Sequence, residues 1–260
     1  MQLYNRSNNN FLGASLVANS GMMVACAPRA KSNMFDGTGS VTGACFAKDN
    51  RSDALTHIFD LPRTDNDDSW KYFRMMGHSI SLTDKDELII GAPLAIPEIL
   101  AGVTNSRNIG HLLKFTKPSK KEGYLAQVRG ADVSPWMSAT LMEATKADPH
   151  KSDMVGTSFA VGRFFDDEDD GSSKRDVVVG APKANRLMGR VYLCKDCFWG
   201  KNWKRPKDQK SIFIEGTQAG TRFGHSVCSV NLNGRGLDEV VVGAPLFSKK
   251  EISSYNQFPV

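Results

Sequence analysis

The chain has 260 residues, of which 40% are hydrophobic and 23% charged, with 23 glycines and a net charge of +5. This length and composition fit a globular protein with one large β domain or two smaller ones. No stretch approaches the roughly 20 apolar residues that a membrane span needs, and the N-terminus lacks the apolar core of a signal peptide. The two basic stretches, 114–121 and 201–210, are interpreted as solvated loops. Since no RNA-binding aromatic motif or helix-turn-helix pattern accompanies them, nucleic acid is not an expected partner.

A short pattern, in which Gly-x-Ser stands between two apolar residues, occurs four times. The copies are at 12–16, 76–80, 155–159 and 223–227. Each copy is followed by an apolar run that ends in Ala-Pro. These runs are at 22–28, 88–93, 177–182 and 240–245. After the first three runs comes an apolar segment led by glycine. These segments are at 42–46, 110–115 and 188–193.

The residue types indicate short buried strands. Valine and isoleucine runs are typical of strands, and a proline directly after such a run ends it because it cannot donate to the ladder. The glycine before Ala-Pro permits a tight turn or close packing against a neighbouring unit. A unit of roughly sixty residues with three or four strands has the size of a propeller blade, and such blades bury their faces by stacking.

The sequence therefore predicts an all-β protein, a partial β-propeller over residues 1–260. Its approximate repeats are 11–49, 72–116, 153–195 and 220–260. The expected activity is binding, and the chain is not expected to be an enzyme. No Gly-x-Ser-x-Gly elbow, HExxH motif or Walker loop is present. His78 and His225 occupy the same repeat position, which favours a structural role for both.

The hairpin turns of the last two repeats are longer than those of the first two and contain many oxygen-bearing side chains. In the third repeat, Asp166, Glu168 and Asp170 stand at alternate positions, Gly171 follows, and Asp176 precedes the valine run. Alternate oxygen ligands, a glycine and a closing carboxylate suit a hard cation such as calcium. The alternative is a solvated acidic loop.

The turn of the fourth repeat has calcium-loop spacing with weaker ligands. Asn231 and Asn233 can each supply a neutral oxygen, Leu237 its carbonyl, and Glu239 the closing carboxylate. Arg235 stands where a third ligand is expected, and its guanidinium could occupy the space of the cation. Calcium binding and a metal-free turn are both open for this repeat.

The units resemble FG-GAP repeats, and most closely those of the N-terminal propeller of integrin α subunits. The resemblance is carried by GTRFGHSVCSVNLNGRGLDEVVVGAPLF at 220–247, by SFAVGRFF with DVVVGAPKANRLMGRVYL, and by FLGASLVANSGMMVACAPRAKS with TGACF. It covers about residues 11–247, with 116–152 poorly matched. An aromatic residue before the glycine is kept only at Phe223.

This resemblance implies a seven-bladed propeller, of which the chain holds roughly blades two to five, with calcium in the later blades. It also implies the extracellular part of a single-pass plasma-membrane receptor, whose signal peptide and membrane span lie outside this fragment. Such a receptor pairs with an integrin β subunit and binds matrix or cell-surface proteins. The alternative is an FG-GAP propeller attached to a secreted hydrolase or phospholipase, or acting as a non-integrin scaffold.

In an extracellular protein, Cys26 and Cys45 are the expected disulfide pair, because the resembling blade carries a cysteine in both places. The Cys194-Lys195-Asp196-Cys197 segment is interpreted as a small disulfide loop or as two cysteines with partners elsewhere. Cys228 lies in a strand pattern and is expected to be a buried thiol. Asn5 and Asn50 begin N-x-S sequons and are candidate glycosylation sites.

Overall fold

The computed structural model describes residues 11–19, 21–30, 42–49, 56–57, 74–82, 88–95, 109–115, 153–165, 176–195 and 212–249. Several residues of interest lie outside these ranges: Asn5, Asn50, Asp166, Glu168, Asp170 and Cys197. Within the described ranges, no helix has the length and apolar character needed to cross a membrane.

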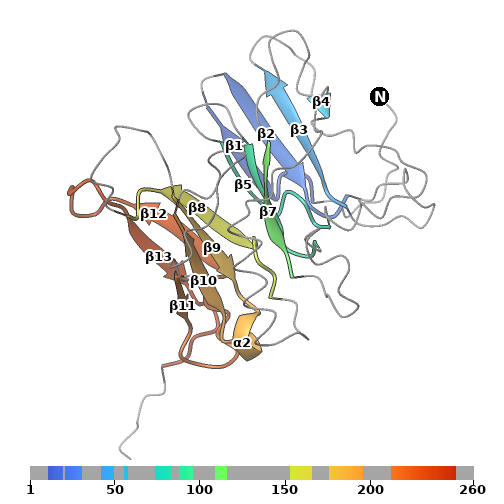
Figure 1. Cartoon of the computed structure of the whole chain (residues 1–260). Coiled ribbons are helices and arrows are strands. Elements are labelled where there is room, and N and C mark those ends of the chain that lie inside the picture. The colour runs from blue at the N-terminus through green and yellow to red at the C-terminus, as the bar shows by residue number, and fades with distance from the viewer. Residues whose placement is uncertain are drawn as a thin grey trace, which may run out of the picture.

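The described strands form four antiparallel sheets that follow one another along the chain (Figure 1). The first contains β1 (Ser15–Ala18), β2 (Met22–Ala27), β3 (Ala44–Asp49) and β4 (Thr56–His57), and the second β5 (Ser79–Leu82), β6 (Leu88–Ala92) and β7 (His111–Phe115). The third contains β8 (Ser158–Gly162), β9 (Asp176–Ala181), β10 (Arg190–Cys194) and β11 (Ile212–Glu215), and the fourth β12 (Ser226–Val230) and β13 (Glu239–Gly243). A short turn, α2 (Ala184–Leu187), follows β9.

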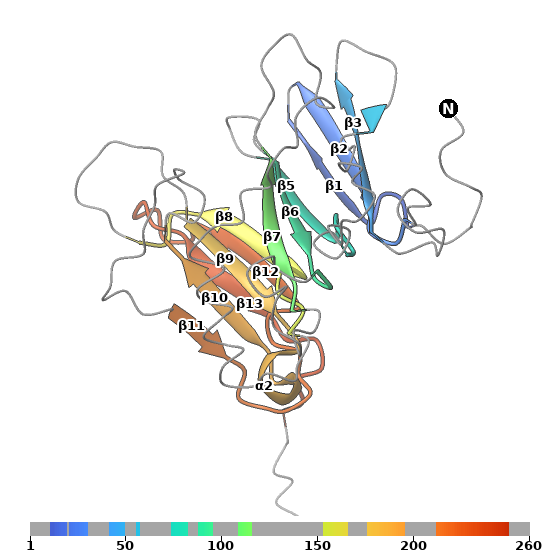
Figure 2. The ribbon, with the colours of Figure 1, turned by 45° about the vertical axis from the view of Figure 1, so that its right-hand side comes forward.

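The sheets stack in chain order. The first strand of each sheet contacts the first strand of the next, so that β1 meets β5, β5 meets β8, and β8 meets β12. In both Figure 1 and Figure 2 the β5–β7 sheet lies between the β1–β4 sheet and the β8–β11 sheet. Strands that are neighbours in sequence are also neighbours within each sheet. The chain is therefore all-β, and its sheets are successive blades of a β-propeller, as the repeats predict.

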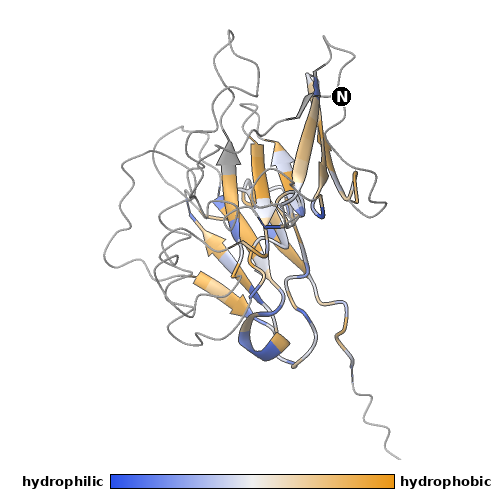
Figure 3. Cartoon of the chain, turned by 90° about the vertical axis from the view of Figure 1, so that its right-hand side faces the viewer, coloured by the Kyte–Doolittle hydropathy of each residue, from blue (hydrophilic) through white to orange (hydrophobic). Residues whose placement is uncertain are grey.

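The continuous apolar runs are explained by burial on both faces of a blade. Leu88 and Ile90 pack into the cluster shared with the first blade, whereas Ile89 packs into the cluster shared with the third. Successive side chains of a strand point to opposite faces, so a blade between two others needs apolar residues at every position. Figure 3 shows the strands mainly in the hydrophobic colour.

Neighbouring blades are joined by the serine of the Gly-x-Ser motif. Its hydroxyl donates a hydrogen bond to the carbonyl of the motif's glycine in the following blade. The three bonds are Ser15 to Gly77 (2.6 Å), Ser79 to Gly156 (2.9 Å) and Ser158 to Gly224 (2.9 Å). We call each of these contacts, together with the glycine described next, a blade joint. The second and third copies of the motif therefore each receive one such bond and give another.

The glycine before Ala-Pro leaves room for this joint. A Cβ atom on Gly91 would lie 2.1 Å from the carbonyl oxygen of Gly156, and one on Gly180 would lie 2.0 Å from that of Gly224. Neither glycine has a positive φ. Of the two roles open from the sequence, the structure therefore supports close packing against the next blade, and the tight-turn role is not needed.

Backbone bonds reinforce each joint at the glycine that leads the third strand. The apolar residue of the next Gly-x-Ser motif donates its N–H to the carbonyl just before this glycine. The three bonds are Met76 to Thr42 (3.1 Å), Val155 to Ile109 (2.8 Å) and Phe223 to Met188 (3.1 Å). Because these bonds involve only the backbone, they tolerate the change from Phe to Met or Val at this position.

We expect the joint hydroxyls to contribute measurably to stability. Replacing Ser158 with alanine removes the bond to the Gly224 carbonyl, at a cost of about 1 kcal/mol. The equivalent hydroxyl of Ser226 has no hydrogen bond among the described residues. Thermal unfolding should therefore show a melting temperature lowered by about 2–4 °C for S158A and nearly unchanged for S226A. Equal shifts for the two variants would contradict the role of the joint.

The outer faces of the first and fourth blades expose apolar side chains. Leu16 is 61% exposed on the first blade and Val241 48% exposed on the fourth. Cys228 is the cross-strand partner of Val241 and is a free, exposed cysteine. The expectation of a buried thiol is therefore wrong, because the face of β12 that carries Cys228 has no blade packed on it among the described residues.

Candidate functional site

The candidate cation loops connect the first two strands of the third and fourth blades. In the third blade, Asp176 is the first residue of β9 and only 4% of its surface is exposed. Its Oδ2 accepts the backbone N–H groups of Phe164 (2.9 Å) and Phe165 (3.1 Å). Asp176 therefore fixes the entrance to the acidic loop. Asp166, Glu168 and Asp170 lie outside the described residues, so their placement as ligands stays a prediction.

Strand pairing gives the correspondence between the two loops. Gly162 faces Asp176 across the third hairpin, and Val230 faces Glu239 across the fourth. Asp176 and Glu239 therefore hold the same position, and each accepts the N–H of the second loop residue, Phe164 or Leu232. By this correspondence, Arg163 stands where the fourth loop has Asn231. The acids of the third repeat thus begin three positions later than the asparagines of the fourth.

The oxygens of Asn231 and Asn233 in the fourth loop bind backbone N–H groups of the same turn. Asn231 Oδ1 accepts from Gly234 (2.6 Å), and Asn233 Oδ1 accepts from Arg235 (2.7 Å). Gly234 and Gly236 both have positive φ, of 68° and 87°, a conformation that glycine adopts without steric cost. The turn is therefore shaped by its own glycines and amide side chains.

Glu239 closes the fourth loop. Its Oε2 accepts the backbone N–H of Leu232 (2.8 Å), and its Oε1 accepts an N–H of the Asn233 side-chain amide. Leu237 is half-buried in the same turn, and Arg235 is exposed. Three of the predicted fourth-loop residues, Asn231, Asn233 and Glu239, are thus brought into one compact turn. Glu239 bonds to N–H groups at both oxygens.

Asp238, which the sequence did not single out, connects the two loops. Its Oδ2 accepts the backbone N–H of Arg163 (3.0 Å) and the Ser229 hydroxyl (2.8 Å), and its own N–H donates to the Arg163 carbonyl (2.7 Å). Arg163 belongs to the third blade and Asp238 to the fourth. We call this set of bonds the Asp238 latch, and it fixes the entrance of the third loop from outside.

The two loops differ in how well their residues suit a calcium ion. Within the described ranges, no three His, Cys, Asp or Glu side chains gather as a metal site. In the third repeat the acid content suits a hard cation, and Asp176 is the described member of that set. In the fourth repeat both oxygens of Glu239, the one carboxylate facing the turn, accept N–H groups, and the other side-chain oxygens are those of neutral amides, so the donor set does not fit a cation well.

Other polar groups of the third blade have structural partners. Arg190 donates from Nε to Glu215 (2.8 Å), and its guanidinium lies over the rings of Phe213 and Tyr192. Burial raises the pKa of Tyr192 to about 12. His78 contacts the Thr157 carbonyl through Nδ1 (2.9 Å), and burial lowers its pKa below the ordinary value. His78 thus supports the joint between the second and third blades.

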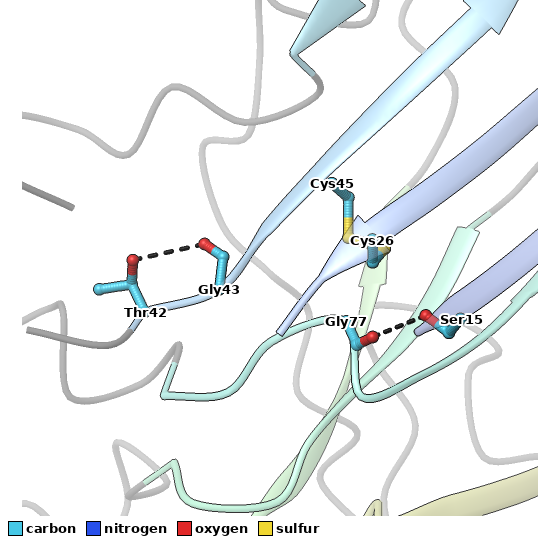
Figure 4. The surroundings of a disulfide bond; sticks show 6 residues. All are labelled: Ser15, Cys26, Thr42, Gly43, Cys45 and Gly77. Carbon is cyan, nitrogen blue, oxygen red and sulfur yellow. Dashed lines mark hydrogen bonds between the residues drawn. A yellow bond between two sulfur atoms is a disulfide. The ribbon is translucent and has the colours of Figure 1, made fainter. Parts of the chain in front are cut away.

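The disulfide joins Cys26 and Cys45 on the paired strands β2 and β3 (Figure 4). Cys26 stands where the other three repeats have the glycine of Gly-Ala-Pro. The two sulfur atoms therefore lie at a blade joint, beside Gly77, whose carbonyl accepts the Ser15 hydroxyl. Cys194 is also disulfide-bonded, and Cys197, the other cysteine of its segment, lies outside the described residues.

The stacked antiparallel sheets, joined at the Gly-x-Ser and Gly-Ala-Pro turns, define a segment of a β-propeller. Comparison with known proteins relates this segment to integrin α subunits. It is 27% identical to integrin alpha-IIb of Homo sapiens, over 91% of this chain and 21% of that protein. It is 26% identical to integrin alpha-PS2 of Drosophila melanogaster, over 95% of this chain and 17% of that protein. No family model matches the chain.

Integrin alpha-5 of Xenopus laevis gives a similar result, with 25% identity over 92% of this chain and 20% of that protein. These matches confirm the resemblance to an integrin α propeller. The chain spans about a fifth of the length of these relatives. The three relatives are all integrin α subunits, in agreement with the expectation that the chain binds and is not an enzyme.

Proposed function

We propose that the chain is part of the ectodomain of a cell-adhesion receptor α subunit. In this proposal it pairs with an integrin β subunit, lies outside the cell in a single-pass plasma-membrane protein, and binds matrix or cell-surface proteins. The observation that carries the proposal is similarity to integrin α subunits over more than nine tenths of the chain. The blade joints support it, because they provide the rigid stacking that a propeller needs for presenting loops to a partner.

The pairing is tested by co-expressing the full-length product with an integrin β subunit of the same organism in cultured cells. We expect the β subunit to be recovered when the product is purified from the cell surface, and not when an unrelated single-pass membrane protein is purified in its place. A full-length product that reaches the surface without any β subunit would overturn the proposal.

We further propose that calcium binds the acidic loop of the third repeat. Asp166, Glu168 and Asp170 supply carboxylates at alternate positions, and Asp176 holds the loop entrance by accepting two N–H groups. Without a cation, the acids at 166–170 would repel one another. Bound calcium would supply the positive charge that offsets this repulsion, and the loop residues would hold it through oxygen ligands.

This site predicts that calcium raises the melting temperature. The triple variant D166N/E168Q/D170N should lose most of the calcium-dependent shift while melting at or above the wild-type temperature in EDTA, because it has fewer acids that repel one another. Asp176 is kept unchanged, because its loss would remove two structural hydrogen bonds in either condition. An undiminished calcium shift in the triple variant would contradict the assignment to these acids.

A further inference from the structure

We infer that the fourth-repeat loop is metal-independent. Its own amide and carboxylate groups hold its shape, and through the Asp238 latch it fixes the entrance of the third-repeat loop. This loop comprises residues 231–239 and contacts Arg163 of the third blade. The inference goes beyond the proposed function, because it assigns a role to a loop whose spacing alone suggests a cation site.

The hydrogen bonds of the Glu239 carboxylate argue against a calcium site in this loop. A calcium ligand presents its oxygens to the ion, and the closing carboxylate of such loops usually provides the strongest ligand. Here the two oxygens of Glu239 accept N–H groups of Leu232 and of the Asn233 side chain. An amide N–H directed at this carboxylate is a hydrogen-bond donor and cannot ligate a cation. The contact that would hold calcium is thus made by a neutral amide.

The fourth-repeat loop also carries too little negative charge for a calcium site. Of the two acids in the loop, Asp238 is engaged by Arg163 and Ser229. Glu239 therefore faces the turn as its one remaining carboxylate, and Arg235 adds a compensating positive charge. Calcium affinity falls as the charge of the ligand set falls. The side-chain oxygens of Asn231 and Asn233 are neutral and are themselves bonded to N–H groups of the turn. They therefore do not replace the missing negative charge.

The fourth-repeat loop makes a close contact with the neighbouring third blade. Asp238 exchanges two hydrogen bonds with the backbone of Arg163, one in each direction. Such an exchange resembles a strand pair that is completed by a side chain. A Cβ atom on the neighbouring Gly162 would lie 2.4 Å from Ser229 Oγ and 2.6 Å from Asp238 Oδ2, so the two blades approach closely here. The loop therefore has a structural task that requires no ion.

Calcium titration calorimetry on the D166N/E168Q/D170N chain separates the two loops, since this background neutralises the three acids proposed as alternate ligands in the third repeat and leaves the fourth repeat unchanged. We expect no saturable binding of calcium up to millimolar concentration. Adding R235D should create saturable binding, because it supplies a carboxylate at the third ligand position and removes the cationic side chain. Saturable calcium binding in the background variant, abolished by E239A, would overturn the inference. Failure of R235D to gain binding would overturn the role assigned to Arg235.

The latch itself is tested by the melting temperature of D238A, with D238N as the conservative variant. We expect D238A to melt roughly 3–8 °C lower, by the same amount in calcium and in EDTA, and D238N to melt between D238A and the wild type. A decrease found only in calcium would identify Asp238 as part of a cation site and would overturn the latch. If the third repeat binds no calcium, the proposed calcium site fails but the inference about the fourth-repeat loop does not. The failure of one proposal can therefore be told from the failure of the other.

Discussion

Alanine at Gly180 is expected to disrupt the joint between the third and fourth blades. Its Cβ would lie 2.0 Å from the Gly224 carbonyl oxygen and 2.4 Å from the Ser158 hydroxyl. Both contacts are far shorter than van der Waals distances, and the carbonyl belongs to backbone that cannot rotate away. The same glycine lies on a strand buried on both faces, which leaves the blade little room to shift. We expect a loss of about 3 kcal/mol or more, at the upper end of overpacking costs.

The measurement is thermal or urea unfolding of G180A beside G21A. Gly21 provides a matched control, because the nearest atom to its added Cβ would be Asn19 Oδ1 at 3.8 Å and its φ is not positive. The same chemical change should therefore leave G21A close to wild type or slightly more stable. A G180A protein as stable as G21A would show that the blades are not in the contact described here.

Removal of the Cys26–Cys45 disulfide is the second change with a large expected effect. The bridge closes a loop of sequence separation 19, and a loop of this length is expected to contribute about 3 kcal/mol by restricting the unfolded chain. Its sulfur atoms also pack beside Gly77 within the cluster shared by the first two blades. The C26A/C45A variant should therefore lose about 3–4 kcal/mol, since a packing cost is added to the loop effect.

C228A provides the control for this experiment, because Cys228 is a free and exposed thiol. It should unfold at the wild-type denaturant concentration. The double variant is preferable to a reducing agent, which would also reduce the disulfide of Cys194. If C26A/C45A unfolds with wild-type stability, the bridge is not a stabilising element of the first blade.

The strands could be predicted from the sequence because their signals are local. Runs such as Leu88–Ala92 and Asp176–Ala181 combine β-branched residues with a proline stop, and the structure shows them buried on both faces. The close packing of Gly180 could be named only as one of two options. Which option holds depends on a carbonyl from Gly224, in another blade, and no local pattern reports that approach.

The candidate loops show the same limit more sharply. Spacing identified Asn231, Asn233 and Glu239 as one turn, and the structure brings these three residues together. Spacing did not reveal that Asp238 points to Arg163, because an acid beside a calcium-like loop looks like any other acid until its partner is known. It also misjudged Cys228, because burial of a strand residue depends on whether a further blade covers that face.

The blade joints have a consequence for how the protein is made on the ribosome. Each serine donor and its glycine acceptor are 62, 77 or 66 residues apart, and the donor always precedes the acceptor. At synthesis rates of about 5–20 residues per second, the acceptor emerges on the order of ten seconds after the donor. During that interval the newest hairpin has one apolar face open to solvent. Assembly is therefore directional, and the most recently translated blade is the part of the nascent chain that most needs protection from aggregation.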